Sequence, residues 1–408
     1  MNQESKTAGP IAASERIPYI DILRGVSLFA ILAGNMRGFN APASVYGNIK
    51  LLFHGRADLI AQALVDILLT GKFVTIFSFL FGVGFAVQLG RAEARGAKFM
   101  SFYPRRLGAL AVFGLIHGIL IWWGDVLLTY AVAGTVLLFF RNRAQKTLLW
   151  WAGAIFSIPL VAIAGLYFVP AHGSSYVPDI ARVHAVIAIY AHGTISQILR
   201  ENLIVWAQGL TGLAFSFYTS FLFLLGMYVW KTGLFQRLDR EQPLLQRVCA
   251  WCLPAGLALN TFVTLVYLHW LPGSPVFFIA NLLQYPSAHI LAAGYAAGLA
   301  VLIHDPRWLR RLMPFDAVGR MALTDYLMQS AIFTVVFDAT GLYGRIGPVL
   351  DWIATIVFFA VQVAISNWWL ERYRFGPVEW LWRAITYWKL PAMRRAPEPD
   401  GYSLSATA

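Results

Sequence analysis

A histidine and an aspartate stand eight residues apart where one long apolar stretch ends. His117 lies inside the stretch, and Asp125 follows directly after it. Eight residues are close to two helical turns, so both side chains can face the same direction. An imidazole that is oriented by a carboxylate can act as a general base. On an uninterrupted helix the two would be about 12 Å apart, so direct contact requires a bent chain. The alternative for His117 is a hydrogen bond to a neighbouring helix.

The first apolar stretch carries a charged pair and an amide. Asp21 and Arg24 are three residues apart and therefore share one helical face. They form either a local ion pair or a cationic clamp for an anionic group. Asn35 lies about 21 Å beyond Asp21 along a helix, where its amide can orient a substrate or polarise a carbonyl.

A second polar stripe lies near the other end of the chain. Arg320 begins an apolar stretch, and Asp325 follows about 8 Å deeper, with Gln329 on the same face one turn further. A carboxylate at membrane depth is costly, so it needs a partner or a task. We expect Asp325 to pair with Arg24 or Arg320, and the alternative is that it carries protons.

The remaining histidines and the cysteines give weaker signals. His54 is a second candidate base, although its place in a connecting segment also suits an ordinary loop residue. His184 and His192 lack a third ligand at suitable spacing, and Cys249 and Cys252 have no second cysteine pair. We therefore predict no metal site.

These residues lie in or beside ten apolar stretches of membrane-spanning length. Basic connecting segments alternate with nearly bare ones, and a cytoplasmic N-terminus places every basic segment inside, as the positive-inside rule requires. The basic segments hold 24 of the 32 Lys and Arg residues. The expected spans are 19–38, 73–90, 106–123, 126–140, 147–168, 207–230, 249–269, 277–303, 318–338 and 350–370.

Composition leads to the same class of protein. Mean hydropathy is +0.61, and only 13% of the residues are charged. The net charge of +12 resides mainly in the basic loops, so it favours anionic lipid headgroups rather than nucleic acid. We expect an all-α, multi-pass protein of the bacterial inner membrane with both termini cytoplasmic.

The chain divides into a tail, a membrane domain and a second tail. Residues 1–18 form the N-terminal tail, and 19–370 form a single transmembrane domain with outer segments 39–72 and 169–206. Residues 371–408 form a cytoplasmic amphipathic segment and tail. No phosphate-binding loop accompanies them.

Several blocks of sequence resemble the YeiB-like family of bacterial inner-membrane proteins, which is a family of unknown function. The first is Arg16-x-x-x-x-Asp21-x-x-Arg24-Gly25 followed by Asn35. The other blocks are 77–84, Gly114-Leu115-Ile116-His117, Gly124-Asp125-Val126-Leu127-x-x-Tyr130-Ala131, 319–324 and 376–383. The resemblance covers residues 16–388. One departure is Asp325, where the family pattern more commonly has Asn.

The family is in turn distantly similar to membrane-embedded acyltransferases such as heparan-α-glucosaminide N-acetyltransferase. That enzyme takes acetyl-CoA on one side of the membrane and modifies an amino sugar on the other. The similarity implies that Asn35 matches an active-site Asn, and that His54 is a loose match for an outer-side His. It also implies acyl-CoA as the donor.

We therefore expect an acyltransferase that moves an acyl group from a cytoplasmic donor to a small-molecule, glycan or lipid acceptor at the outer face. In this hypothesis His117 or His54 is the base, and Asn35 stabilises the oxyanion. Arg24, Arg105 and Arg106 bind the CoA phosphates. The full expected set is catalytic His117, His54, Asn35 and Asp125, with Asp21, Arg24, Arg105, Arg106, Tyr130, Arg320, Asp325 and Gln329 binding substrate or cofactor.

Two alternatives belong to other classes. A secondary transporter would use Asp325 and the proline-interrupted stretch around Pro286 for coupled translocation. A non-catalytic scaffold or lipid-binding protein would need none of these groups. Membrane lipids are partners in every case, and all three hypotheses are compatible with a homodimer.

Overall fold

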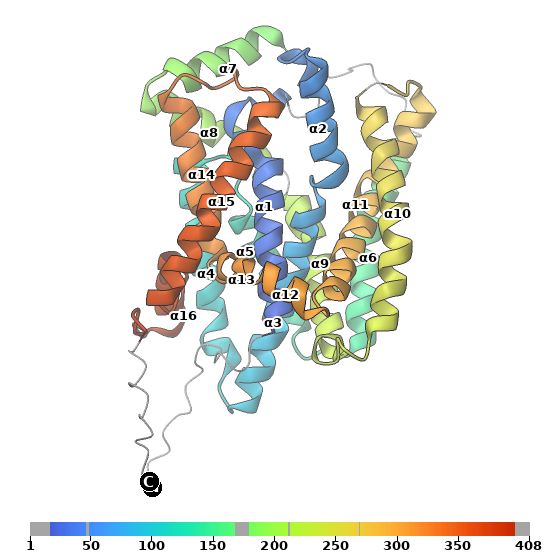
Figure 1. Ribbon diagram of the computed structural model, residues 1–408, viewed down its shortest axis with the longest axis vertical. Helices are drawn as coiled ribbons and strands as arrows, with labels where there is room; N and C mark the ends of the chain where they lie inside the picture. Colours follow the sequence, from blue (N-terminus) through green and yellow to red (C-terminus); the bar gives the residue numbers. More distant parts are fainter. Residues whose placement is uncertain (1–16, 46–48, 168–178, 211–212, 269, 396–408) are drawn as a thin grey trace, which may run out of the picture.

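The computed structural model is a bundle of helices (Figure 1). It describes residues 17–45, 49–167, 179–210, 213–268 and 270–395. Within these ranges the helices are α1 (Pro18–Asn40), α2 (Arg56–Leu68), α3 (Lys72–Ala94), α4 (Tyr103–Ile116), α5 (Leu127–Phe140), α6 (Gln145–Tyr167), α7 (Ile180–His192), α8 (Ile195–Leu210), α9 (Leu213–Lys231), α10 (Gln242–Tyr267), α11 (Ser274–Leu302), α12 (Pro306–Leu312), α13 (Pro314–Arg320), α14 (Ala322–Ala339), α15 (Pro348–Arg372) and α16 (Pro377–Tyr387). No strand occurs in these ranges, so the all-α expectation is confirmed.

In the part of the chain that the structure describes, seven helical stretches are long and apolar enough to cross a membrane, which makes this a multi-pass membrane protein. They are Pro18–Asn40, Arg56–Ala94, Phe99–Ile121, Gln145–Gly165, Gln242–Tyr267, Ser274–Leu302 and Pro348–Arg372. The other three expected spans correspond to α5, α9 and α14, which are also helical. Helix α5 has only 14 residues, about 21 Å, and is short for a span.

The expected outer segments both contain helices. Within 39–72, α2 stands upright above α3 in Figure 1 rather than forming a loop over the bundle. Within 169–206, α7 and α8 cover the end of the bundle opposite α16 in Figure 1. The tail before residue 17, residues 168–178 and the tail after 395 lie outside the described residues.

Glycines bring the central helices into backbone contact. A Cβ on Gly82 of α3 would lie 2.0 Å from the Phe223 carbonyl oxygen of α9, and one on Gly226 would lie 2.0 Å from the Phe79 carbonyl oxygen. Small residues permit such close crossings in membrane bundles, where helix association depends on packing. Helices α3 and α9 therefore form a tightly joined centre.

The apolar stretch that contains His117 does not continue as a regular helix. Residues His117–Ile121 form a π-helical turn, closed by the Trp122 amide donating to the His117 carbonyl oxygen at 2.8 Å. The chain then reverses through residues 122–126 into α5, which packs against α4. Gly114 permits this approach, because a Cβ there would lie 2.4 Å from the Leu128 amide nitrogen.

Candidate functional site

A cavity of about 560 Å³ lies among α1, α3, α4, α5, α13, α14 and α16, and we call it the arginine cavity. Its lining comes from segments far apart in the sequence, from Arg24 to Arg383. The residues used below are Arg24, Asn35, Val74, Phe77, Leu110, Arg106, Asp125, Tyr130, Arg320, Tyr326, Glu379, Trp382 and Arg383. The site is therefore a product of the whole bundle.

Four arginines define one part of this cavity: Arg24, Arg106, Arg320 and Arg383. Arg24 donates to Asp21 at 3.1 Å, and Arg320 donates to Asp316 at 3.3 Å. Both aspartates lie outside the lining. The guanidinium of Arg106 instead stacks on Trp382, 3.5 Å from the ring centroid. Guanidinium groups in this arrangement suit phosphate or carboxylate groups of a ligand.

The cavity continues along α1 to a different set of groups. Arg24 and Asn35 are eleven residues apart on that helix, about 16 Å. Asn35 is half-buried there, and the Asp125 carboxylate lies on the same lining. An elongated ligand with an anionic end can therefore present its other end to an amide and a carboxylate.

His117 and Asp125 are in direct contact. The His117 Nδ1 atom lies 3.0 Å from Asp125 Oδ1, and both side chains are almost fully buried. The 12 Å separation expected on a straight helix is wrong, because the π-helical turn ends the helix at His117 and the chain turns back. The bend that direct contact required is present.

Backbone amides fix the Asp125 carboxylate in place. The Leu127 amide donates to Oδ1 at 3.1 Å, and the Leu128 amide donates to Oδ2 at 2.8 Å. Amides in the first turn of α5 have no acceptor within the helix, and the helix dipole favours negative charge there. A carboxylate held this way orients the imidazole, with Nδ1 donating and Nε2 left as an acceptor.

The second nitrogen of His117 has no hydrogen-bond partner in the described part of the chain, although it is buried. The imidazole packs against Tyr326, with ring centroids 5.2 Å apart, and Tyr326 lines the cavity. His117 itself is not on the wall. The structure therefore places a general-base candidate directly behind Asp125 and Tyr326.

Helix α16 closes the cavity on the side of the arginines. Glu379 Oε1 accepts hydrogen bonds from the amides of Leu323 and Thr324 at 2.7 and 3.0 Å, which joins α16 to the start of α14. Burial raises the pKa of Glu379, and these hydrogen bonds oppose that rise. The Trp382 indole donates to the Arg106 carbonyl oxygen at 2.8 Å. Both contacts hold α16 over the site.

A second cavity of about 570 Å³ lies among α2, α3, α9, α10 and α11, and we call it the second cavity. Its central group is His289, which lies 3.0 Å from Thr75 Oγ1 and 2.7 Å from the Tyr218 hydroxyl. Asp66 accepts from Arg37 at 3.4 Å and from Gln62 at 2.9 Å. The ionisable and hydroxyl groups of this cavity thus largely satisfy one another.

The structure divides the second polar stripe: Arg320 lines the arginine cavity, whereas Asp325 and Gln329 line neither cavity. Asp325 accepts hydrogen bonds from the Ser366 hydroxyl at 3.0 and 3.2 Å, so the expected pairing with Arg24 or Arg320 is wrong. Gln329 donates to Gln362 at 2.8 Å. Both contacts join α14 to α15, and neither residue lines the arginine cavity or the second cavity.

The other expected residues divide between the site and its surroundings. His54 is exposed in the segment before α2, which suits its reading as a loop residue. Arg105 lies over the Trp388 ring at 5.7 Å and does not line the arginine cavity. Asp21 acts on the cavity only through its ion pair with Arg24. Tyr130 does line it.

Sequence reasoning missed Glu379, Trp382 and Arg383 as site residues. All three fall in the 376–383 block, which was noted for its resemblance alone. The charged and aromatic residues of that block recur at helical spacing after the last span, and that spacing was the available signal. The second cavity was missed as well, although the proline-interrupted stretch around Pro286 supplies part of its lining, including His289.

Curated relatives match this chain over nearly its full length. It is 34% identical to the uncharacterized protein YxaH of Bacillus subtilis over 406 residues, which cover 93% of this chain and 96% of the relative. The chain belongs to the YeiB-like family. It is 28% identical to the uncharacterized protein YeiB of Escherichia coli, over 91% of this chain and 96% of the relative. Residues 229–389 match the family model described as a protein of unknown function, DUF418.

A third relative extends the same pattern. An uncharacterized 39.9 kDa protein from the amylase 3' region of Bacillus acidopullulyticus is 29% identical, over 93% of this chain and 96% of the relative. None of these descriptions names an activity. The function has to be argued from the site.

Proposed function

We propose that this YeiB-like protein is an acyltransferase of the bacterial inner membrane that takes its acyl group from a cytoplasmic acyl-CoA-type donor. One observation carries the proposal: a single cavity joins four arginines to Asn35 and to the carboxylate that orients His117. An anionic, elongated donor is the ligand whose charge and length match that arrangement. The acceptor would be at the outer face.

The topology that we propose has ten spans, with both termini in the cytoplasm. The alternation of basic and nearly bare connecting segments supports it. In this topology the arginines of the cavity lie toward the cytoplasm, because Arg106 and Arg320 end basic segments and Arg383 follows the last span. The donor then enters from the side where acyl-CoA is made.

Donor binding rests on charge-assisted hydrogen bonds. Arg24, Arg106, Arg320 and Arg383 would bind the phosphates of the donor, each such contact contributing about 1.5–3 kcal/mol. Asp21 and Asp316 hold two of these guanidinium groups from outside the cavity. The arginines are therefore positioned before the ligand arrives.

The chemical step is an acyl transfer with conventional proton movements. The acceptor hydroxyl or amine attacks the thioester carbonyl carbon while His117 Nε2 takes its proton. The Asn35 amide donates to the oxyanion, and collapse breaks the C–S bond as the thiolate leaves and receives the proton. Because Tyr326 packs against the imidazole, this step requires the Tyr326 ring to move aside.

Acetyl-CoA binding to the purified protein tests the donor assignment. We expect acetyl-CoA to raise the melting temperature in detergent, and Arg106→Gln with Arg320→Gln to abolish that rise. The paired control is Arg105→Gln, which alters an adjacent arginine that does not line the cavity. An equal rise in all three proteins would contradict the proposal.

A specific observation also favours the transporter. Two cavities of similar size lie side by side in the bundle and share Val74 in their linings. The Asp325–Ser366 contact removes the residue that we expected to couple protons, because that contact lies outside both cavities. Uptake driven by a proton gradient and unaffected by His117→Gln would favour transport over transfer. A scaffold predicts that neither acetyl-CoA nor His117→Gln has any effect beyond stability.

A further inference from the structure

The donor chemistry leaves the second cavity without a role, although it equals the arginine cavity in size. We propose that the second cavity binds the acceptor, and that the hydrogen-bonded pair Ser78–Tyr130 closes the route between the two cavities. This inference rests on the proposed acyl transfer. It concerns Ser78 and Tyr130, to which the donor-binding and proton-transfer steps above assign no role.

The wall between the cavities is one face of α3 together with one tyrosine. Val74 lines both cavities, Ser78 lines the second, and Tyr130 lines the arginine cavity. The Ser78 hydroxyl lies 2.7 Å from the Tyr130 hydroxyl, which also approaches the Val74 carbonyl oxygen at 3.5 Å. The two linings therefore meet at Val74 and at the Ser78–Tyr130 contact.

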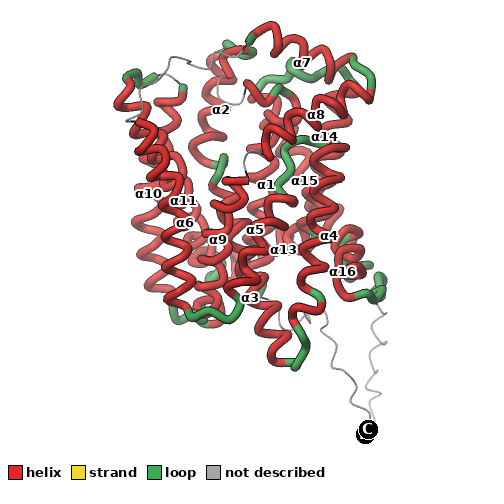
Figure 2. The backbone as a smooth tube through the Cα atoms, turned by 180° about the vertical axis from the view of Figure 1, so that it is seen from behind, coloured by secondary structure: helices red, strands yellow, loops and turns green. Residues whose placement is uncertain are grey.

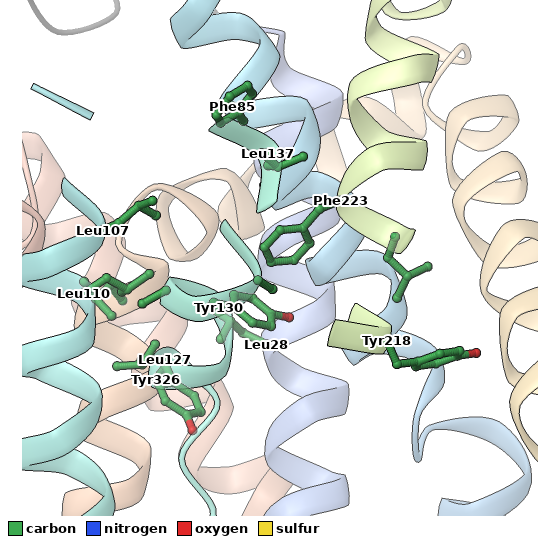
Figure 3. Close-up of a cluster of buried hydrophobic side chains, with 14 of the residues drawn as sticks. Leu28, Phe85, Leu107, Leu110, Leu127, Tyr130, Leu137, Tyr218, Phe223 and Tyr326 are labelled. Atoms are coloured by element: carbon green, nitrogen blue, oxygen red, sulfur yellow. The ribbon is translucent and has the colours of Figure 1, made fainter. Parts of the chain in front are cut away.

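The ring of Tyr130 is held, whereas its hydroxyl contact is easily broken. Phe81 and Phe223 pack edge-on against the ring, with centroids 5.5 and 5.3 Å away. Figure 3 shows Tyr130 between Leu28 and Phe223, with its hydroxyl directed toward the side on which Tyr218 lies. A neutral hydroxyl pair is a modest constraint, and serine is small. Its separation would open a passage without moving a helix.

The lining of the second cavity indicates an uncharged ligand that bears hydroxyl groups. Its Lys72 ammonium donates to the Asp66 carbonyl oxygen at 2.6 Å, and Arg37 pairs with the Asp66 carboxylate. Its other polar lining residues are amides, hydroxyls and a histidine engaged at both nitrogens. Paired charges contribute little to binding an ion, whereas tyrosine faces, amides and hydroxyls suit a neutral hydroxylated acceptor.

Single cysteines report from which side of the membrane each cavity can be reached. In a background with Cys249→Ser and Cys252→Ser, Val263→Cys marks the second cavity and Leu110→Cys marks the arginine cavity. Val83→Cys is the control, because Val83 is fully buried and lines neither cavity. Each variant is exposed to membrane-impermeant sulfonatoethyl methanethiosulfonate in right-side-out and in inside-out vesicles.

We expect Val263→Cys to react only from the outer side and Leu110→Cys only from the cytoplasmic side. Adding Tyr130→Ala makes Leu110→Cys react from the outer side as well, with at least a tenfold gain in rate. Tyr130→Phe, which keeps the ring, gives a smaller gain. One-sided labelling that persists in Tyr130→Ala at an unchanged melting temperature would overturn the route, as would labelling of both cysteines from the same side.

Reagent charge tests the class of acceptor. Labelling rates of Val263→Cys with hydroxyethyl, sulfonatoethyl and trimethylammonioethyl methanethiosulfonate are divided by those of exposed Ala57→Cys. We expect the neutral reagent to lead at Val263→Cys by several-fold, and the anionic one to lead over the cationic one at Leu110→Cys. Equal normalised rates at Val263→Cys would overturn the neutral assignment.

The same labelling separates this inference from the donor assignment. Acetyl-CoA should protect Leu110→Cys from the cytoplasmic side. If protection fails while the two-sided pattern and its response to Tyr130→Ala hold, the donor is wrong and the route stands. If protection holds while the pattern fails, the donor stands and the route is wrong.

Discussion

The two cavities differ in charge far more than in size. The arginine cavity presents four guanidinium groups with the carboxyl groups of Asp125 and Glu379, and two of its arginines pair with aspartates outside the lining. In the second cavity, Asp66 satisfies Arg37 and Lys72 from within the lining. Similar volumes can therefore serve opposite purposes, because a charge bound inside its own cavity is no longer available to a ligand.

The two cavities lie between different groups of helices. Figure 2 shows α10, α11 and α6 grouped on one side, and α14, α15, α4 and α16 on the other. Helices α1, α3, α5 and α9 stand between them. The central helices thus separate a site with four arginines from one whose ionisable groups bind one another, and variants on either side should be distinguishable.

The largest effect should come from Asp125→Ala. It leaves the buried imidazole of His117 and two helix amides without their acceptor, which costs about 3 kcal/mol or more of stability. We expect acyl transfer to fall at least a hundredfold. Ser366→Ala, which removes the hydroxyl partner of Asp325 outside both cavities, is the comparison. A loss of transfer as large in Ser366→Ala would show that the effect is not specific to the site. Single-turnover transfer and melting temperature are the readouts.

The next largest loss of stability and of transfer is expected for Gly114→Ala. Its Cβ would lie 2.4 Å from the Leu128 amide nitrogen and 2.8 Å from Asp125 Oδ2, so α5 must shift by overpacking, at about 1–3 kcal/mol. The matched variant is Gly108→Ala on the same helix, where no atom lies within 4 Å. We expect a lower melting temperature and weakened transfer in the first variant only. Equal behaviour of the two alanine variants would refute the role of Gly114.

A smaller effect distinguishes the cationic groups of the two cavities. Arg320→Gln should weaken acetyl-CoA binding about tenfold, because one charge-assisted contact is lost. Arg37→Gln in the second cavity should leave acetyl-CoA affinity unchanged within about twofold, since that arginine is already bound to Asp66. Isothermal titration on both variants checks this. A loss of affinity in Arg37→Gln would remove the distinction between the cavities.

The smallest effect belongs to Tyr218→Phe. It removes one neutral hydrogen bond to His289, which contributes about 1 kcal/mol to stability. We expect a melting temperature lower by a few degrees and an unchanged response to acetyl-CoA. Thermal unfolding with and without acetyl-CoA measures both quantities. A change in the ligand response would mean that the donor reaches the second cavity.

Local sequence was enough to predict the helical, multi-pass architecture, because apolar length and charge alternation are local signals. Six residues that the sequence singled out line one cavity: Arg24, Asn35, Arg106, Asp125, Tyr130 and Arg320. These residues share a signal: each is a polar group or tyrosine in a membrane stretch or beside its end. Their convergence could be expected because polar groups at membrane depth collect around wetted space.

The errors arose where a distant partner decides the outcome. Asp325 was expected to need a positively charged partner. Instead the hydroxyl of Ser366, 41 residues further along the chain on α15, donates a hydrogen bond to it. Glu379, Trp382 and Arg383 line the arginine cavity only because α16 folds back onto α4 and α14. Spacing within α16 predicts an amphipathic face, but it does not say which surface that face covers.

The wide turn at His117–Ile121 makes the acid–base pair sensitive to chain length. A π-helical turn accommodates one residue more than the regular helix would over the same rise. Deleting one of residues 118–121 would remove that extra residue and shorten the chain between His117 and Asp125, so the reversal through residues 122–126 would have to take another path. Loss of one codon in this short stretch should therefore separate imidazole from carboxylate, even though every side chain that does chemistry is still encoded.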